Sequence, residues 1–227
     1  MQTQFLATVS HELRTPLTVI NGALGLLSQG GAKLSDAQKA RLLGKATDSS
    51  ETLTTLVNDL IDTQSLSSAA FSIDLQSVAL GPLVQGAVAR AESLQPDKDI
   101  RFTCALSDAP LTVQADAERL GQVFGNVLSN AVKFSLPGGL VEVSLVQAEG
   151  MALVQVSDSG CGIPPGAEEQ VFARFSQLDG SDTKTAYGSG LGMHITRQIL
   201  DRHGGSIRYV SAPGVGTTFT ISLPLVA

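Results

Sequence analysis

The stretch "FLATVSHELRTPLTVI", residues 5–20, decides how the chain folds at its N-terminal end. Apolar side chains recur here every three or four positions, which predicts an amphipathic helix. His11 lies on the side of this helix that faces away from the apolar stripe. Pro16 has no N–H group, so the carbonyl of Glu12 loses its helical partner. The sequence therefore predicts an exposed histidine, followed one turn later by a local bend that gives a partner access to the ring.

Glu12 changes the interpretation of that histidine. An exposed histidine alone is typical of an ordinary protein surface. A neighbouring carboxylate, however, fixes the tautomer and the orientation of an imidazole ring. The pair therefore favours a reactive site over a simple surface position.

Residues 1–68 are predicted to form a helical hairpin. The first apolar stripe continues to Leu27, and "SQGGAK", residues 28–33, interrupts it with a glycine pair. Ser35 and Asp36 then supply a cap and a first-turn acid for a second long helix. Because both stripes have nearly heptad spacing, we expect two copies to pair as a four-helix bundle, which makes the protein a homodimer.

Residues 69–227 alternate between strands and helices. Strands are expected over residues 71–80, 99–106 and 111–115, with helices over residues 82–93, 116–133 and 190–202, and hairpins at residues 141–160 and 205–225. Asp116 is expected to cap the second of these helices. The turn of the first hairpin falls at Glu149–Gly150. This order predicts an α/β sandwich with one sheet and one helical layer.

Composition excludes several classes of function. The 227 residues carry a formal net charge of -6, which argues against sequence-independent binding to the phosphate backbone of nucleic acid. Long apolar runs are missing, so we expect no membrane contact by this chain. The two cysteines fit no metal spacing, which favours a reducing, cytoplasmic location. The helical pattern begins almost at Met1, which is typical of a piece cut from a longer protein. That longer protein could itself be anchored in a membrane.

A nucleotide site is predicted on "ERLGQVFGNVLSNAVKFS", residues 118–135. Asn126 and Asn130 lie one turn apart on one helical face, and Lys133 follows three positions later. Two amides and a lysine suit a hydrated magnesium triphosphate, with the oxygen of Asn126 as the metal ligand. The alternative is that these asparagines are ordinary surface residues.

Two glycine motifs extend this prediction. In "DSGCGI", residues 158–163, Asp158 is a candidate acceptor for the amino group of adenine, and Gly160 and Gly162 allow close backbone approach. Neither a Rossmann fingerprint nor a Walker motif is formed. "GSGLGM" opens a helix whose N-terminus suits phosphate, and its candidate ligands are Gly188, Gly190, Leu191 and Gly192.

Between the glycine motifs lies a polar segment, residues 176–187, which we expect to act as a mobile lid over the nucleotide. Phe172 and Phe175 would hold its root. Lys184 is a candidate phosphate ligand, although a solvated loop lysine is the simpler interpretation.

"SHELRTPLT", residues 10–18, resembles the phosphoacceptor box of sensor histidine kinases, the transmitters of two-component systems. The resemblance implies that His11 is phosphorylated, that Glu12 is its acid–base partner and that Thr15 places water for dephosphorylating the partner regulator. Residues 118–135, the glycine motifs and "GVGTTF", residues 214–219, resemble in order the boxes of the Bergerat (GHKL) ATP-binding fold. The upstream residues of the first box match as well: Asp116, Arg119 and Gln122.

The resemblance covers nearly the whole chain. It implies an ATP- and Mg2+-dependent protein histidine kinase that phosphorylates itself and then passes the phosphoryl group to an aspartate of a response regulator. A chaperone or topoisomerase ATPase of the same fold would lack the histidine hairpin. A docking module without catalysis is the other alternative. His194 and His203 match no catalytic position, His203 being expected at a helix C-terminus, and Cys161 is best explained as a small filler beside the nucleotide.

Overall fold

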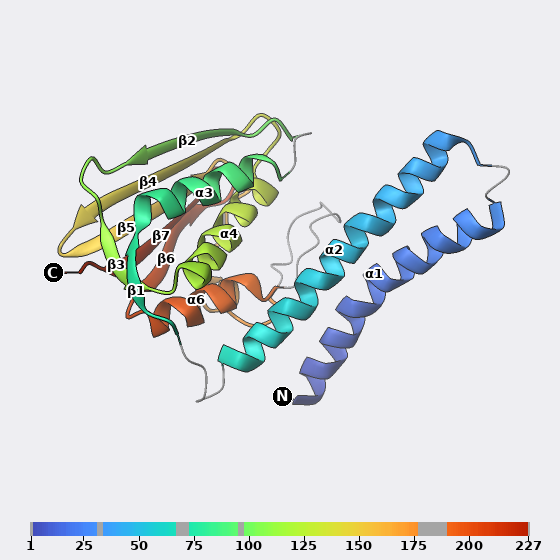
Figure 1. The fold of residues 1–227 in the computed structure, drawn as a ribbon, viewed down its shortest axis with the longest axis horizontal. Coiled ribbons are helices and arrows are strands. Elements are labelled where there is room, and N and C mark those ends of the chain that lie inside the picture. The colour runs from blue at the N-terminus through green and yellow to red at the C-terminus, as the bar shows by residue number, and fades with distance from the viewer. Residues whose placement is uncertain (1, 31–33, 67–72, 95–97, 177–189, 227) are drawn as a thin grey trace.

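The computed structural model describes residues 2–30, 34–66, 73–94, 98–176 and 190–226. A helical hairpin leans against an α/β sandwich, and the two parts meet along the C-terminal half of the second hairpin helix (Figure 1). The predicted combination of a hairpin and a sandwich is confirmed.

The hairpin consists of α1 (Gln2–Gly30) and α2 (Asp36–Leu66), which pack against each other along their length. α2 starts with a capping box, in which Ser35 and Gln38 exchange backbone-to-side-chain hydrogen bonds of 2.9 and 3.3 Å. α1 continues through Pro16 as a single helix, and Pro16 itself is buried. The bend expected at this proline stays a prediction.

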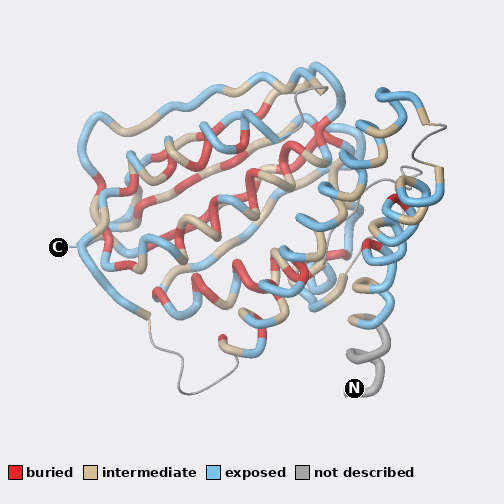
Figure 2. Tube along the Cα trace, turned by 45° about the vertical axis from the view of Figure 1, so that its right-hand side comes forward, coloured by how far each residue is buried: buried red, intermediate tan, exposed pale blue. Residues whose placement is uncertain are grey.

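Much of both hairpin helices is exposed (Figure 2), and the exposed residues include large apolar ones. Five of them are about half exposed or more: Leu17, Leu24, Leu26, Leu43 and Ile61. One chain therefore covers only part of the apolar surface that the sequence places on its hairpin.

The sandwich is built on a five-stranded sheet. Its order is β2 (Arg101–Leu106), β4 (Leu140–Ala148), β5 (Met151–Asp158), β7 (Gly216–Pro224) and β6 (Ser206–Ala212). β2 runs parallel to β4, and the other neighbours are antiparallel. The layer of helices contains α3 (Leu80–Glu92), α4 (Ala117–Phe134) and α6 (Gly192–Arg202), which lie on one face of the sheet (Figure 1).

The structure differs from the sequence-based expectation in three features. Of the strand expected over residues 71–80, the described part forms β1 only over Gln76–Ala79, since residues 73–75 are not in a strand and the buried Leu80 already begins α3. Residues 71 and 72 lie outside the described residues. β1 pairs with β3 (Thr112–Ala115) as a separate two-stranded sheet, so the sandwich contains more than one sheet. A short helix, α5 (Glu168–Val171), was not expected.

Alternating side chains build the core between sheet and helices. On β5, Ala152, Val154 and Val156 point inward and are almost fully buried. The inner face of α4 supplies the matching helical stripe: Leu120, Val123, Phe124, Val127, Leu128 and Ala131. Leu66, at the end of α2, belongs to the same cluster. The last turn of the hairpin is therefore part of the sandwich core.

α4, the helix that carries the predicted nucleotide residues, is fixed at its start. The Asp116 carboxylate accepts hydrogen bonds of 3.1 Å from the backbone N–H groups of Glu118 and Arg119, as predicted for its cap. His203 lies at the C-terminal end of α6, as expected. Its Nε2 accepts a hydrogen bond from the Asp116 N–H at 3.0 Å, and its Nδ1 donates one to the Ile199 carbonyl at 2.7 Å. This histidine therefore locks the end of α6 to the start of α4.

Candidate functional site

The His11 side chain lies free on α1, with 77% of its surface exposed. Its Nδ1 is 3.8 Å from Oε1 of Glu12, which is beyond a direct hydrogen bond but close enough for the carboxylate to act on the ring. Thr15 Oγ1 donates a hydrogen bond to the His11 carbonyl at 3.4 Å, so its hydroxyl lies one helical turn after His11 on α1. The exposure that the helical pattern predicts for His11 is confirmed.

Asn126 links the two helices of the predicted nucleotide site. Its amide nitrogen donates to the Gly192 carbonyl at 3.0 Å and to Thr196 Oγ1 at 3.4 Å. α4 and the first turn of α6 are thereby joined through one side chain. Among the described residues, no hydrogen bond engages Oδ1 of Asn126, so this oxygen remains available to a cation.

Asn130 and Lys133 follow Asn126 on α4, and both are half-buried. Burial lowers the pKa of Lys133, and the nearby ammonium of Lys98 lowers it further. Lys98 Nζ donates to the last carbonyls of α4, those of Val132, Lys133 and Ser135, at 3.2, 2.5 and 3.2 Å. The end of α4 is therefore a positive site, which suits phosphate groups.

Asp158 ends β5 beside the end of α4, because Gly160 forms a backbone bridge with Ser135. Burial raises the pKa of its carboxyl group, and the backbone N–H groups of Gly160 and Thr217 partly oppose this shift. The Gly160 N–H donates to Asp158 Oδ1 at 2.9 Å. The carboxylate, which also accepts from the Thr217 N–H, has lone pairs for a further donor such as an exocyclic amino group.

Backbone packing explains two of the predicted glycines. Gly162 has φ +71°, and a Cβ there would lie 2.1 Å from the Ala212 carbonyl oxygen. Gly190 has φ +63°, and a Cβ there would meet the backbone of Phe175 and Ser176 at 2.8 Å. Gly160, Leu191 and Gly192 are also described, with Leu191 buried in the core.

Part of the predicted site cannot be placed. Lys184, Gly188 and residues 177–187 of the expected lid lie outside the described residues. Phe172, expected at its root, is half-buried between Arg197 and Tyr209. Cys161 is exposed in the loop after β5.

Two family models match consecutive parts of this chain. Residues 1–69 match the His Kinase A (phospho-acceptor) domain, and residues 115–227 match the histidine kinase-, DNA gyrase B- and HSP90-like ATPase domain. The solved mycobacterial sensor histidine kinase MprB is 34% identical, with a TM-score of 0.60 over 66% of this chain and 98% of that one. This chain belongs to the sensor histidine kinases. It is a two-component transmitter with a phosphoacceptor hairpin and a GHKL-type ATP-binding domain.

Other histidine kinases match over almost the whole chain. The circadian input-output histidine kinase CikA of Synechococcus elongatus is 36% identical, and the match covers 97% of this chain and 30% of CikA. The full-length kinase ShkA, solved in complex with AMPPNP, is 30% identical, with a TM-score of 0.72 over 99% of this chain and 46% of ShkA. The chain therefore spans less than half the length of either relative.

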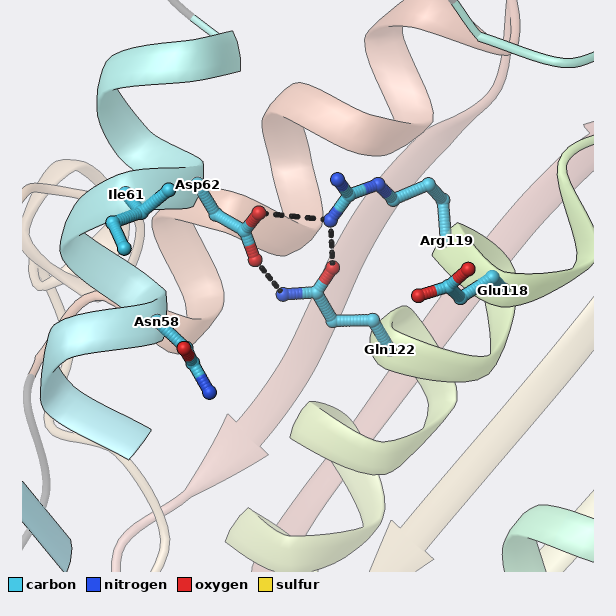
Figure 3. A pocket seen from close by; sticks show the side chains of 6 residues that line it. All are labelled: Asn58, Ile61, Asp62, Glu118, Arg119 and Gln122. Carbon is cyan, nitrogen blue, oxygen red and sulfur yellow. Dashed lines mark hydrogen bonds and ion pairs between the residues drawn. The ribbon is translucent and has the colours of Figure 1, made fainter. Parts of the chain in front are cut away.

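In this kinase the hairpin and the ATP-binding domain meet at an open cavity of about 360 Å³ (Figure 3). It lies between α2 and α4, and its lining residues, which do not include Asn126 or Asp158, are Asn58, Ile61, Asp62, Glu118, Arg119 and Gln122. Arg119 and Gln122, which the sequence shows only as members of the first ATP box, point toward the hairpin here.

Asp62 binds both of these side chains. Its carboxylate accepts from Arg119 Nη1 at 2.9 Å and from Gln122 Nε2 at 2.6 Å, while Arg119 also donates to Gln122 Oε1 at 3.0 Å. Four residues later, the Leu66 carbonyl accepts from Arg202 Nη2 at 2.6 Å. These contacts fasten the end of α2 to α4 and α6. We call these contacts the Asp62 clamp; the sequence did not predict them.

Replacing Asp62 with alanine should loosen the end of α2. The change leaves Arg119 and Gln122 without their shared carboxylate, and breaking a partly buried charged network of this kind costs roughly 1–3 kcal/mol. We expect backbone amides in the last two turns of α2 to exchange with deuterium about tenfold faster. Asp36→Ala is the control, since Asp36 forms only an exposed ion pair with Lys39 at the other end of α2. Equal exchange in both variants would contradict the clamp.

Among the described residues, no helix combines the length and the apolar character that crossing a bilayer requires. Within the same residues, no three side chains of His, Cys, Asp or Glu gather as a metal site.

Proposed function

We propose that this chain is the catalytic core of a protein histidine kinase, which phosphorylates His11 with ATP and passes the phosphoryl group to an aspartate of a response regulator. Residues 1–68 would form the phosphotransfer hairpin and residues 69–227 the ATP-binding domain. The observation that carries the proposal is the exposed His11–Glu12 pair on a helix joined to an ATP-binding fold. The other members of that fold named above lack such a hairpin.

ATP would lie between α4 and α6. Asp158 would accept a hydrogen bond from the amino group of adenine, because its carboxylate is already desolvated and held by the Gly160 N–H. Asn130, Lys133 and the N-terminal turn of α6, with Gly190, Leu191 and Gly192, would hold the phosphates. We add Lys184 and Gly188 to these phosphate ligands only because of their positions in the motifs that resemble those of the family. The relative ShkA, with its bound AMPPNP, supports a nucleotide in this domain.

The residues present also fit Mg2+. Asn126 keeps its Oδ1 free of described hydrogen bonds, while its nitrogen is fixed on Gly192. Magnesium retains several waters and needs few protein ligands, so a single amide oxygen suffices beside the phosphates. Such an ion supplies neutralisation of the phosphate charge.

His11 would act as the nucleophile. Glu12 lies on the Nδ1 side of the ring, so it favours a proton there and leaves the lone pair on Nε2. Nε2 would form a bond to the γ-phosphorus while the bond to the bridging oxygen breaks, and ADP would leave with that electron pair. The Nδ1 proton would then pass to the Glu12 carboxylate, which leaves a neutral phosphorylated ring. Most of the rate would come from alignment and charge neutralisation. The ATP-binding domain would have to move relative to the hairpin, and the Asp62 contacts would limit this movement.

We propose two partners. A second copy would cover the apolar side chains left exposed on α1 and α2, giving a dimeric four-helix bundle. A response regulator would dock near His11 and, with Thr15 placing a water molecule, could also be dephosphorylated there. The cytoplasm is the compartment that supplies ATP and such regulators.

Incubation with magnesium and γ-labelled ATP tests the proposal. We expect label on the wild-type chain that is labile in acid and stable in base, as a phosphohistidine is. Asn126→Ala should lose the label, because it removes both the proposed metal ligand and the link to Gly192.

Intact nucleotide binding without any label would favour the docking module instead. Label that resists acid would indicate a serine or threonine kinase and would also contradict the proposal. Exclusive hydrolysis of ATP would favour an ATPase.

A further inference from the structure

His194 uses both ring nitrogens to connect two segments of the ATP-binding domain. It is the third residue of α6, and it is half-buried. Arg174 Nε lies 3.0 Å from its Nε2, and the Phe172 carbonyl oxygen lies 3.1 Å from its Nδ1. A guanidinium N–H can only donate, so Nε2 must carry a lone pair and the ring proton must sit on Nδ1. The contacts therefore define one neutral tautomer.

The two segments meet a second time next to this histidine. The backbone of Gly190 packs so tightly on Phe175 and Ser176 that a Cβ would lie 2.8 Å from their atoms. Residues 172–176 and 190–194 thus form one unit, held by a backbone contact at one end and by His194 at the other. Arg197, one turn further along α6, stacks on Phe172 at 5.5 Å and adds a third contact.

This unit also reaches the centre of the nucleotide region. Asn126 donates to the carbonyl of Gly192, which lies in the same helical turn as His194. A shift of residues 190–194 would therefore move the N–H groups that open α6 and would disturb Asn126 as well. Displacements of this kind weaken binding without contact to the ligand.

We propose that His194, as the neutral Nδ1–H tautomer, is a positioning residue for nucleotide binding: it holds the second glycine motif, residues 190–192, against residues 172–176. This inference rests on the proposed ATP-binding function. His194 acts through Phe172 and Arg174 and touches no substrate.

The surrounding charges oppose a protonated ring. Burial lowers the pKa of His194; the Phe172 carbonyl partly opposes this, and the positive charges of Arg174 and Arg197 lower the pKa further. An imidazolium could no longer accept from Arg174 and would face both guanidinium groups. Acid should therefore weaken the contact between the two segments, and nucleotide binding with it.

The test is calorimetric titration of the full chain with Mg-ADP, comparing wild type, His194→Ala and His194→Gln at pH 7.5 and 5.5. His194→Ala should raise Kd about tenfold at pH 7.5, the size of a modest coupling between sites. His194→Gln should recover part of this loss, because its Oε1 can accept from Arg174. From pH 7.5 to 5.5, Kd should rise severalfold more for wild type than for His194→Gln, because only the imidazole can take up a proton and lose its acceptor for Arg174.

The glutamine variant provides the internal control for pH. The other titratable groups are the same in both proteins, so the difference between the two profiles belongs to His194. A wild-type profile identical to that of His194→Gln would overturn the inference, as would an unchanged Kd in His194→Ala. Failure of all three proteins to bind Mg-ADP would instead overturn the proposed function, and the inference with it.

Discussion

Replacing His11 with glutamine should reduce the transfer of phosphate from ATP to the protein to background, while the affinity for nucleotide stays unchanged. Glutamine has no nucleophilic ring nitrogen, so no phosphoramidate can form. The side chain is 77% exposed and packs on little, so its loss should not disturb the fold. The measurement is incorporation of label from γ-labelled ATP, with Mg-ADP titration on the same sample.

Thr15→Ala is a matched control on the same helix. Among the described residues, the Thr15 side chain bonds the His11 carbonyl alone, and this contact is long, at 3.4 Å. We expect this variant to keep its autophosphorylation and to slow only the dephosphorylation of a regulator. If His11→Gln kept acid-labile label, another residue would be the acceptor. If Thr15→Ala lost label as completely as His11→Gln, damage to α1 would explain both results.

Local patterns in the sequence were sufficient for the hairpin and for much of the sandwich. Apolar spacing predicted both long helices and the exposure of His11, because a helical wheel fixes which side chains share a face. Asp116 was predicted as a helix cap, and its carboxylate accepts the two backbone N–H groups that such a cap should. The turn at Glu149–Gly150 was predicted too, and both residues have positive φ.

Contacts between distant residues were beyond these patterns. Nothing in the spacing of Asp62 indicates that it would meet Arg119, 57 positions later, since that pairing depends on how the hairpin leans on the sandwich. His194 was set aside for the same reason, because its partners follow α5, a short helix that the sequence did not predict. The pairing of β1 with β3 apart from the main sheet likewise depends on tertiary packing, which strand propensity does not encode.

Gly162→Ala should destabilise the ATP-binding domain by about 3 kcal/mol and weaken nucleotide binding, because two penalties add at this position. Its φ of +71° disfavours any side chain, and the new Cβ would lie 2.1 Å from the Ala212 carbonyl oxygen. That carbonyl belongs to the end of β6, which is part of the sheet and cannot move alone. The loop would have to shift instead and take the Gly160 N–H away from Asp158.

Gly214→Ala separates the two penalties. Gly214 has nearly the same backbone conformation, with φ +73°, but a Cβ there meets nothing within 4 Å. Gly214→Ala should therefore lower the free energy of unfolding by only about 1 kcal/mol, the penalty for a side chain at positive φ. Urea unfolding monitored by circular dichroism, with Mg-ADP titration, compares the two variants. A larger loss for Gly162→Ala in both measurements would mean that close packing of the loop on β6, rather than backbone conformation alone, requires the glycine and keeps Asp158 in place. Equal losses would leave the positive φ as the whole reason for glycine at residue 162.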